Sequence, residues 1–132
     1  MEVLDAHVNL VEQIYTKYKK SSLIMSGMET LYVQEQKALT TYKQRVTKNK
    51  IQADEISTHA CNIQNELDKF EKQYDQLCKE LRSLTCKFTD DKDRKDYDNK
   101  INEFCFLYRE RYNNIDDIRF DQQQLVKRIG KK

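Results

Sequence analysis

Residues 56–88 read ISTHACNIQNELDKFEKQYDQLCKELRSLTCKF, and apolar side chains recur through this stretch at alternating intervals of three and four residues. The members of the series are Ile56, Ala60, Ile63, Leu67, Phe70, Tyr74, Leu77, Leu81, Leu84 and Phe88. A period of this kind aligns the side chains along one stripe of an α-helix, which is typical of a coiled-coil seam. The stretch therefore predicts a long helix that packs lengthwise against other helices.

The same register continues backwards to the beginning of the chain. Its earlier members are Leu4, His7, Val11, Ile14, Tyr18, Ser21, Met25, Met28, Tyr32, Glu35, Leu39, Tyr42, Val46, Asn49 and Ala53. We therefore predict one helix over about residues 5–88. A capping-box pattern at Ser26-Gly27-Met28-Glu29 is a place where this helix could break, but the heptad phase crosses it unchanged.

The register fails after Phe88, and a new one begins that is out of phase by one residue. Its members are Tyr97, Ile101, Phe104, Tyr108, Arg111, Ile115, Ile118, Gln122, Leu125 and Ile129. Because a tight turn resets the phase freely, we predict a turn near residues 89–96 and a second helix over about 91–129 that folds back to form a helical bundle. Thr89 or Asp90 is the expected N-cap, and the aspartates at its start favour the positive end of the new helix.

The composition favours an elongated all-α protein. The chain has no proline, two glycines, 35% charged residues and a mean hydropathy of −0.94. Turns of sheet proteins lean on glycine and proline, and a low hydropathy suits a thin rod with a narrow seam. We expect a single elongated coiled-coil unit over residues 1–132, with the long helix over 1–88, the turn over 89–96, the second helix over 97–129 and a basic tail over 130–132.

Charge and cysteine spacing indicate no cofactor, and they favour a compartment in which thiols stay reduced. The formal net charge is +2, and the cysteines at positions 61, 78, 86 and 105 lack the spacing of metal ligands. No apolar run is long enough for a membrane span. We therefore expect no cofactor, no metal and no membrane span, and an intracellular location in the cytoplasm or nucleus, where thiols stay reduced.

Charges that flank the seam favour an antiparallel pair of long helices. A parallel homodimer would oppose Arg45 to Lys50 and Glu66 to Glu71, which repel each other. An antiparallel homodimer centred near residue 54 would instead place Arg45 against Glu66 and Leu39 against Phe70. A heteromeric assembly, in which the partner supplies complementary charges, and a monomeric helical bundle are the alternatives.

The expected oligomer interface is the central part of the seam. Its residues are Leu39, Tyr42, Val46, Asn49, Ala53, Ile56, Ala60, Ile63, Leu67, Phe70, Tyr74 and Leu77. In the antiparallel register, Glu35 would meet Tyr74, whose hydroxyl could reach the carboxylate. Asn49 would either fix the register, as buried polar residues do in coiled coils, or form a partly hydrated layer.

A basic stretch without an acidic residue precedes the middle of the chain. Its members are Lys37, Lys43, Arg45, Lys48 and Lys50. Such a stretch can contact nucleic acid or an acidic filament, although it lacks the dense arginine of a leucine-zipper basic region. Solvated charges that face a partner helix are the simpler interpretation, so nucleic acid is not the expected partner.

The sequence lacks the signatures of catalysis. The glycines stand alone, so there is no phosphate-binding loop, and a rod offers no deep pocket. We therefore expect a noncatalytic structural or scaffold subunit that self-associates and docks helices of other proteins in a larger assembly. Long heptads of this kind are similar to those in subunits of cell-division, meiotic chromosome, tethering and ciliary complexes alike. The alternative is a polyanion-binding module that uses residues 37–50.

Overall fold

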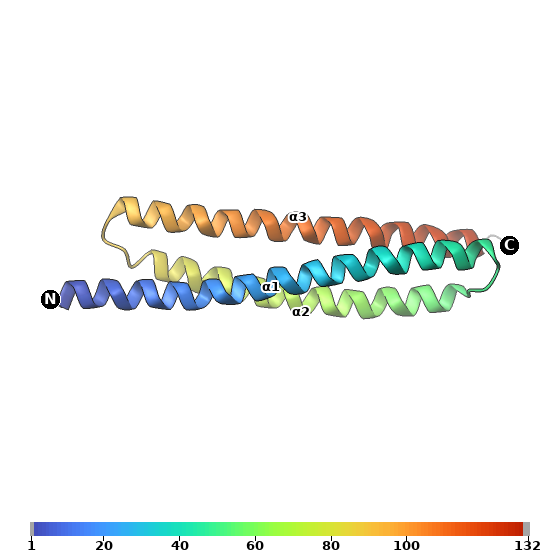
Figure 1. Ribbon diagram of the computed structural model, residues 1–132, viewed down its shortest axis with the longest axis horizontal. Coiled ribbons are helices and arrows are strands. Elements are labelled where there is room, and N and C mark those ends of the chain that lie inside the picture. The colour runs from blue at the N-terminus through green and yellow to red at the C-terminus, as the bar shows by residue number, and fades with distance from the viewer. Residues whose placement is uncertain (1, 131–132) are drawn as a thin grey trace.

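The computed structural model describes residues 2–130, apart from the side chains of residues 2–4 and 130, and this part of the chain forms three α-helices. They are α1 (Glu2–Thr47), α2 (Ala53–Thr85) and α3 (Asp91–Gly130). The helices lie side by side in alternating directions (Figure 1), and each packs against the other two. The predicted all-α helical bundle is confirmed. The side chain of Leu4 and the predicted basic tail at residues 130–132 lie outside the described part.

The prediction of a single helix over residues 5–88 is wrong, because the chain reverses its direction at residues 48–52. At this point α1 ends, and α2 runs back along it (Figure 1). Asn49 has a φ of 60°, the left-handed conformation that asparagine tolerates better than most residues. The heptad phase gave no sign of the break, because a loop that joins two helices can preserve the phase as easily as shift it.

Backbone hydrogen bonds explain why the helix ends there. The amide of Lys50 donates to the carbonyl of Arg45 at 2.8 Å, and the amide of Asn49 donates to the carbonyl of Val46 at 3.1 Å. This pair of bonds, around a left-handed residue, is a Schellman motif that satisfies the last carbonyls of α1. The Arg45 guanidinium also donates to the carbonyl of Lys50 and contacts Glu55 at 2.9 Å. Asn49 is therefore a helix stop and not a buried seam residue.

The second reversal lies close to its predicted place. It occupies residues 86–90, so it begins three residues before the predicted range of 89–96, whereas α3 begins at Asp91, as expected. The carboxylate of Asp90 accepts a hydrogen bond from the amide of Lys92 at 3.1 Å, which confirms Asp90 as an N-cap. Phe88 folds back into the core with 3% exposure and stacks on Tyr97 at 4.9 Å between ring centroids.

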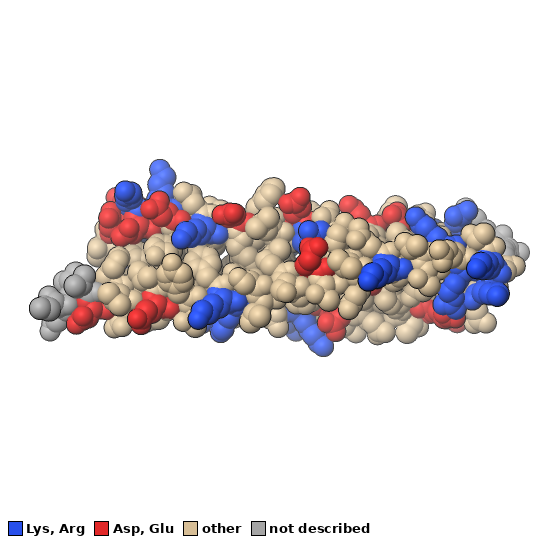
Figure 2. Space-filling model, in the orientation of Figure 1, with Lys and Arg blue, Asp and Glu red and all other residues tan. Residues whose placement is uncertain are grey.

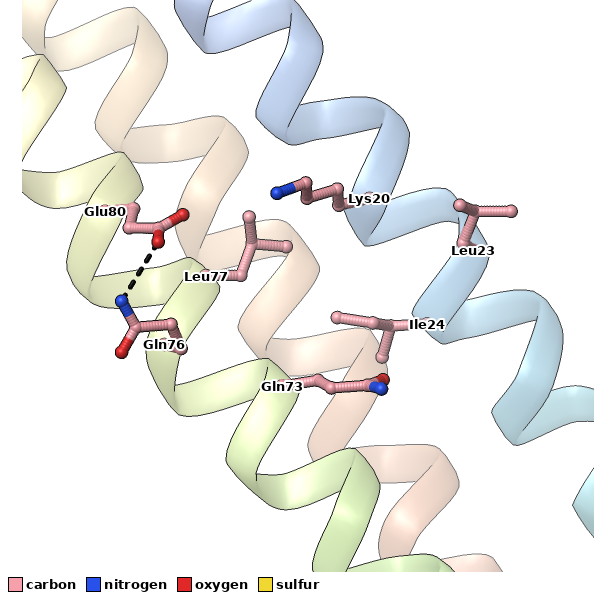
Figure 3. A pocket seen from close by; sticks show the side chains of 7 residues that line it. All are labelled: Lys20, Leu23, Ile24, Gln73, Gln76, Leu77 and Glu80. Carbon is pink, nitrogen blue, oxygen red and sulfur yellow. Dashed lines mark hydrogen bonds between the residues drawn. The ribbon is translucent and has the colours of Figure 1, made fainter.

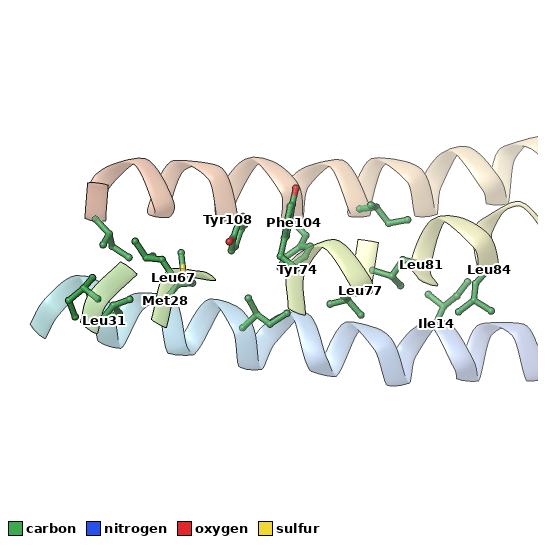
Figure 4. Packing of buried hydrophobic residues seen from close by; sticks show 14 of the residues in the cluster. Ile14, Met28, Leu31, Leu67, Tyr74, Leu77, Leu81, Leu84, Phe104 and Tyr108 are labelled. Atoms are coloured by element: carbon green, nitrogen blue, oxygen red, sulfur yellow. The ribbon is translucent and has the colours of Figure 1, made fainter. Parts of the chain in front are cut away.

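The helices share one hydrophobic core, which extends along the rod from Ile14, Leu84 and Phe88 to Leu31, Ile63 and Ile115 (Figure 4). Its fully enclosed members come from all three helices, and they include Ile14, Met28, Leu67, Leu81, Ile101, Tyr108 and Ile115. Ile24 and Leu31, which flank the predicted seam, are also buried. A helix that is apolar beyond one narrow stripe contacts more than one neighbour, and here α1 packs against both α2 and α3.

Aromatic rings and one carboxylate join α2 to α3 in the middle of the rod. Tyr74 and Tyr108 stack with 3.9 Å between their centroids, and the Tyr108 hydroxyl donates to Glu71 at 2.6 Å. Arg109 binds the same carboxylate at 2.9 Å. Burial, together with the hydrogen bond to Glu71, raises the pKa of Tyr108 well above its ordinary value, so this phenol stays a hydrogen-bond donor.

The antiparallel pairing of α1 with α2 differs in register from the one predicted between two chains. Arg45 pairs with Glu55 and not with Glu66, and Phe70 lies against Gly27 and not against Leu39. The physical reason is the loop at residues 48–52, which brings the end of α1 directly beside the start of α2 and so fixes every later contact.

Gly27 lies inside α1, which continues unbroken through the capping-box pattern at residues 26–29. A Cβ atom at Gly27 would lie 2.7 Å from two ring atoms of Phe70. The glycine is therefore needed for the close approach of the Phe70 ring, although glycine costs about 1 kcal/mol relative to alanine in a helix.

We expect Gly27→Ala to change the stability by different amounts in two backgrounds. In the natural chain the new methyl group displaces the Phe70 ring, and this cost offsets the gain in helix propensity. In a Phe70→Ala background the same change should stabilise the fold by about 1 kcal/mol. Urea unfolding of the four proteins in this cycle measures the difference, and an equal effect in both backgrounds would refute the steric role of Phe70.

Candidate docking groove

The residues predicted to form an oligomer interface mostly pack inside the chain's own bundle. Five of them are buried: Ile56, Ile63, Leu67, Tyr74 and Leu77. Six are partly buried: Leu39, Tyr42, Val46, Ala53, Ala60 and Phe70. Asn49 is exposed in the first loop. The neighbouring helices of the same chain thus fill the seam, so the surfaces open to other molecules lie outside it. The oligomeric state stays a prediction.

A polar layer interrupts the core where all three helices meet. Glu35 of α1 is 1% exposed, and its carboxylate contacts His59 Nε2 of α2 at 2.7 Å. Gln122 of α3 is fully buried and donates from Nε2 to the other carboxylate oxygen at 3.1 Å. The Tyr42 ring packs edge-on against the His59 ring. Because buried polar groups need partners, this layer favours one lengthwise register of the three helices.

Sequence reasoning found one member of this layer and missed the others. Glu35 is a polar residue of the predicted seam, but within the chain its carboxylate contacts His59 and Gln122 and not the predicted Tyr74. The Tyr74 ring stacks on Tyr108 instead. His59 does not lie on the heptad stripe, and Gln122 had no evident partner in sequence. Only the register set by the first loop brings them to Glu35.

The outer side of the bundle is hollowed between α1 and α2. Figure 3 shows the middle of this α1–α2 groove, which is lined by Lys20, Leu23, Ile24, Gln73, Gln76, Leu77 and Glu80. Ile24 and Leu77 are buried at its floor, whereas Leu23 is 73% exposed. A leucine this open beside an apolar floor is a site where another apolar side chain can be buried.

The groove continues in both directions along the two helices. Toward the start of α1 it is lined by Gln13, Lys17, Lys79 and Leu84, and then by Leu10, Lys87 and Phe88. In the other direction it is lined by Gly27, Leu31, Ile63, Glu66 and Phe70. The hollows therefore follow the crossing of α1 and α2 over several helical turns, which is the shape that a helix lying lengthwise would fill.

The part of the groove that runs from its middle toward the start of α1 has a positively charged rim. Lys20, Lys79 and Lys87 are exposed there, and Lys17 contacts Glu80 at 2.6 Å. The pKa of the Glu80 carboxyl is lowered, chiefly by the hydrogen bond from Lys17 and to a smaller extent by the one from Gln76. Because Glu80 is already matched by Lys17, the other lysines leave an excess of positive charge beside the apolar floor.

The predicted polyanion contacts gather at one end of the rod. Lys37, Lys43, Lys48 and Lys50 are exposed, whereas Arg45 is held by Glu55. The antiparallel fold also brings Lys127 and Arg128, in the last turn of α3, to this end. Figure 2 shows the basic side chains gathered there. Cations at the ends of α1 and α3 also complement the helix dipoles, so their clustering has a structural reason as well.

The cysteines do not form a metal site within the part of the chain that the structure describes. Cys78 and Cys105 face each other at 3.6 Å between sulfurs, and burial raises the pKa of the Cys78 thiol to about 12. Cys61 and Cys86 are exposed and free. In residues 2–130, no group of three or more histidine, cysteine or acidic side chains is placed to hold a metal ion. None of the three helices has a segment of the length and apolarity needed to cross a membrane.

Comparison with known proteins adds no relative. No known protein family matches the chain, and no curated protein or solved structure shows significant similarity to it.

Proposed function

We propose that the chain is a noncatalytic structural subunit that docks an amphipathic helix in its α1–α2 groove. The occupant is a helix with an apolar stripe and acidic flanks. The observation that carries the proposal is Leu23, which lines the groove with 73% of its surface exposed, next to the buried Ile24 and Leu77 and beside an excess of lysines. A fourth helix laid along the groove would complete a four-helix bundle.

The energetics of such docking favour this occupant. Burying one leucine side chain contributes about 1.5–3 kcal/mol, and the matching apolar stripe of the partner adds a similar amount. Acidic flanks would meet Lys20, Lys79 and Lys87, which steers the encounter and selects among partners more than it adds affinity. The surface therefore fits a scaffold that gathers helical proteins into a larger assembly.

A probe peptide tests the groove directly. The probe is a fluorescent helix with leucines along one stripe and glutamates on both sides. We expect Leu23→Asp to weaken its binding at least about tenfold, since the change removes an apolar contact and adds a repelling charge. Fluorescence anisotropy measures the affinity, and circular dichroism confirms that the exposed substitution leaves the fold intact.

Val33→Asp is the matched control, because Val33 is an exposed apolar residue of α1 that does not line the groove. It should leave the affinity unchanged. Equal losses in both variants would contradict the docking site. Loss on replacing Lys48 and Lys50, with no effect at Leu23, would favour the polyanion-binding alternative, whose affinity would also fall steeply with salt.

A further inference from the structure

The outer face of α3 carries an acidic and aromatic stripe that the bundle does not use. Asp96, Glu103, Glu110 and Asp117 recur at intervals of seven residues, and all four are exposed. Among the residues that the structure describes, none of these four makes an ion pair. Phe106 and Phe120 lie on the same side of the helix and are 68% and 59% exposed. We call these six residues the acidic α3 face.

The periodicity places these residues on one surface. Positions seven residues apart lie almost in line along a helix, and positions three apart are neighbours. Phe106 follows Glu103 by three residues, and Phe120 follows Asp117 by three. Each phenylalanine therefore lies next to a carboxylate. Figure 2 shows acidic side chains recurring along the edge that α3 forms, together with basic side chains toward its two ends. Aromatic side chains are enriched in protein contact surfaces, where a polar rim surrounds them.

The acidic α3 face and the α1–α2 groove lie on opposite sides of the molecule. Each helix packs against the other two, so α3 covers one side of the α1–α2 pair. The groove opens on the other side, and its lining contains residues of α1, α2 and the adjoining second loop but none of α3. A molecule bound to one surface therefore leaves the other free.

The two surfaces also match in chemistry. The groove offers Leu23 and an apolar floor beside Lys20, Lys79 and Lys87, whereas the acidic α3 face offers two phenylalanines beside four carboxylates. The acidic α3 face thus combines exposed apolar rings with carboxylates on a helix, which are the two features of the occupant argued above for the groove. Two α3 faces set against each other would instead bring like charges together, so a two-fold contact through this face is disfavoured.

We infer that the occupant of the α1–α2 groove is the acidic α3 face of a second copy of this chain, and that copies join head to tail. The inference rests on the proposed function of the groove. Such a contact is heterologous, because two different surfaces meet. Each copy has one surface of each kind on opposite sides, so successive copies extend into an open series in which rods lie side by side.

The test uses two full-length variants, each with one surface disabled. Leu23→Asp disables the groove, and Phe106→Ser combined with Phe120→Ser disables the acidic α3 face. The natural chain should grow in mass with concentration at low salt, in analytical ultracentrifugation or light scattering. Each variant alone should stay at the chain mass of 15.9 kDa.

An equimolar mixture of the two variants is the decisive sample. Each then has one intact surface, and the intact surfaces are complementary, so the mixture should form a complex of twice the chain mass that grows no further. All substituted residues are exposed, and unchanged circular dichroism and melting exclude unfolding as the cause. The inference would be overturned if the mixture stayed monomeric. It would also be overturned if the natural chain stayed at 15.9 kDa under the conditions in which it binds the probe peptide.

The outcomes separate this inference from the proposed function. If the natural chain binds the acidic probe peptide but does not self-assemble, the groove docks helices of other proteins and the inference alone fails. If neither the peptide nor a second copy binds, both fail. If assembly persists in the double phenylalanine variant, copies associate through another surface, and the inference is refuted.

Discussion

Replacing Leu67 by aspartate is expected to unfold the bundle. Leu67 has no exposed surface and lies in the core shared by all three helices. A carboxylate there would lose its hydration without gaining a partner, at a cost of several kcal/mol. Since the whole fold of a small domain is stable by only about 5–15 kcal/mol, we expect much of the population to lose its structure. The separated helices are marginal in water, so helicity should fall as well.

Far-ultraviolet circular dichroism during heating measures this loss. Asn65→Asp is the matched control, because it places the same side chain two residues away on the exposed side of α2. We expect the control to melt within a few degrees of the natural chain. If Leu67→Asp melted like the control, the assignment of Leu67 to the core would be contradicted.

The second large effect is expected in the polar layer of Glu35, His59 and Gln122. Glu35→Leu would leave the fully buried amide of Gln122 without its hydrogen bond, and Gln122→Leu would leave one carboxylate oxygen of Glu35 without its donor. Each buried group left without a partner costs about 1–3 kcal/mol. His59 is 28% exposed along its side chain, so it can exchange Glu35 for water.

The double substitution should cost less than either single one. With leucine at both positions 35 and 122, no buried donor or acceptor of this pair is left unsatisfied, and apolar replacements of buried polar pairs are often neutral or stabilising. Urea unfolding of the natural chain, both single variants and the double variant gives the coupling free energy. Strictly additive costs would show that Glu35 and Gln122 do not act together.

The two reversals of the chain left different signals in the sequence. At the second reversal the apolar register shifts by one residue and Asp90 follows as a cap, so the turn could be predicted. At the first reversal the apolar stripe continues in phase from Val46 to Ile56. The remaining signal is chemical: Asn49 is a residue that readily takes the left-handed conformation, although the heptad pattern assigns it to the seam.

The missed reversal also explains what could not be predicted about the candidate sites. The apolar residues of the central seam are predicted to form an oligomer interface, and most of them pack inside the bundle of the chain itself, because their partners depend on which helix lies beside them. Once α2 folds onto α1, Phe70 meets Gly27 and Glu35 meets His59. Leu23 lies off the heptad stripe, and its significance depends on the groove beside it. Surface positions of this kind can be recognised only after the bundle is assembled.

The two short connections have a consequence for the order of folding. Residues 48–52 and 86–90 join helices that are neighbours in sequence, so each helical pair closes only a small loop, whereas α1 and α3 meet across the length of α2. Local contacts of this kind form quickly. Glu35 and His59 can meet in the first hairpin, but Gln122 reaches them only when α3 docks. We therefore expect the polar layer to select the correct register of α3 in the last step of folding. A third helix that docks in a shifted register would leave the Gln122 amide buried without an acceptor.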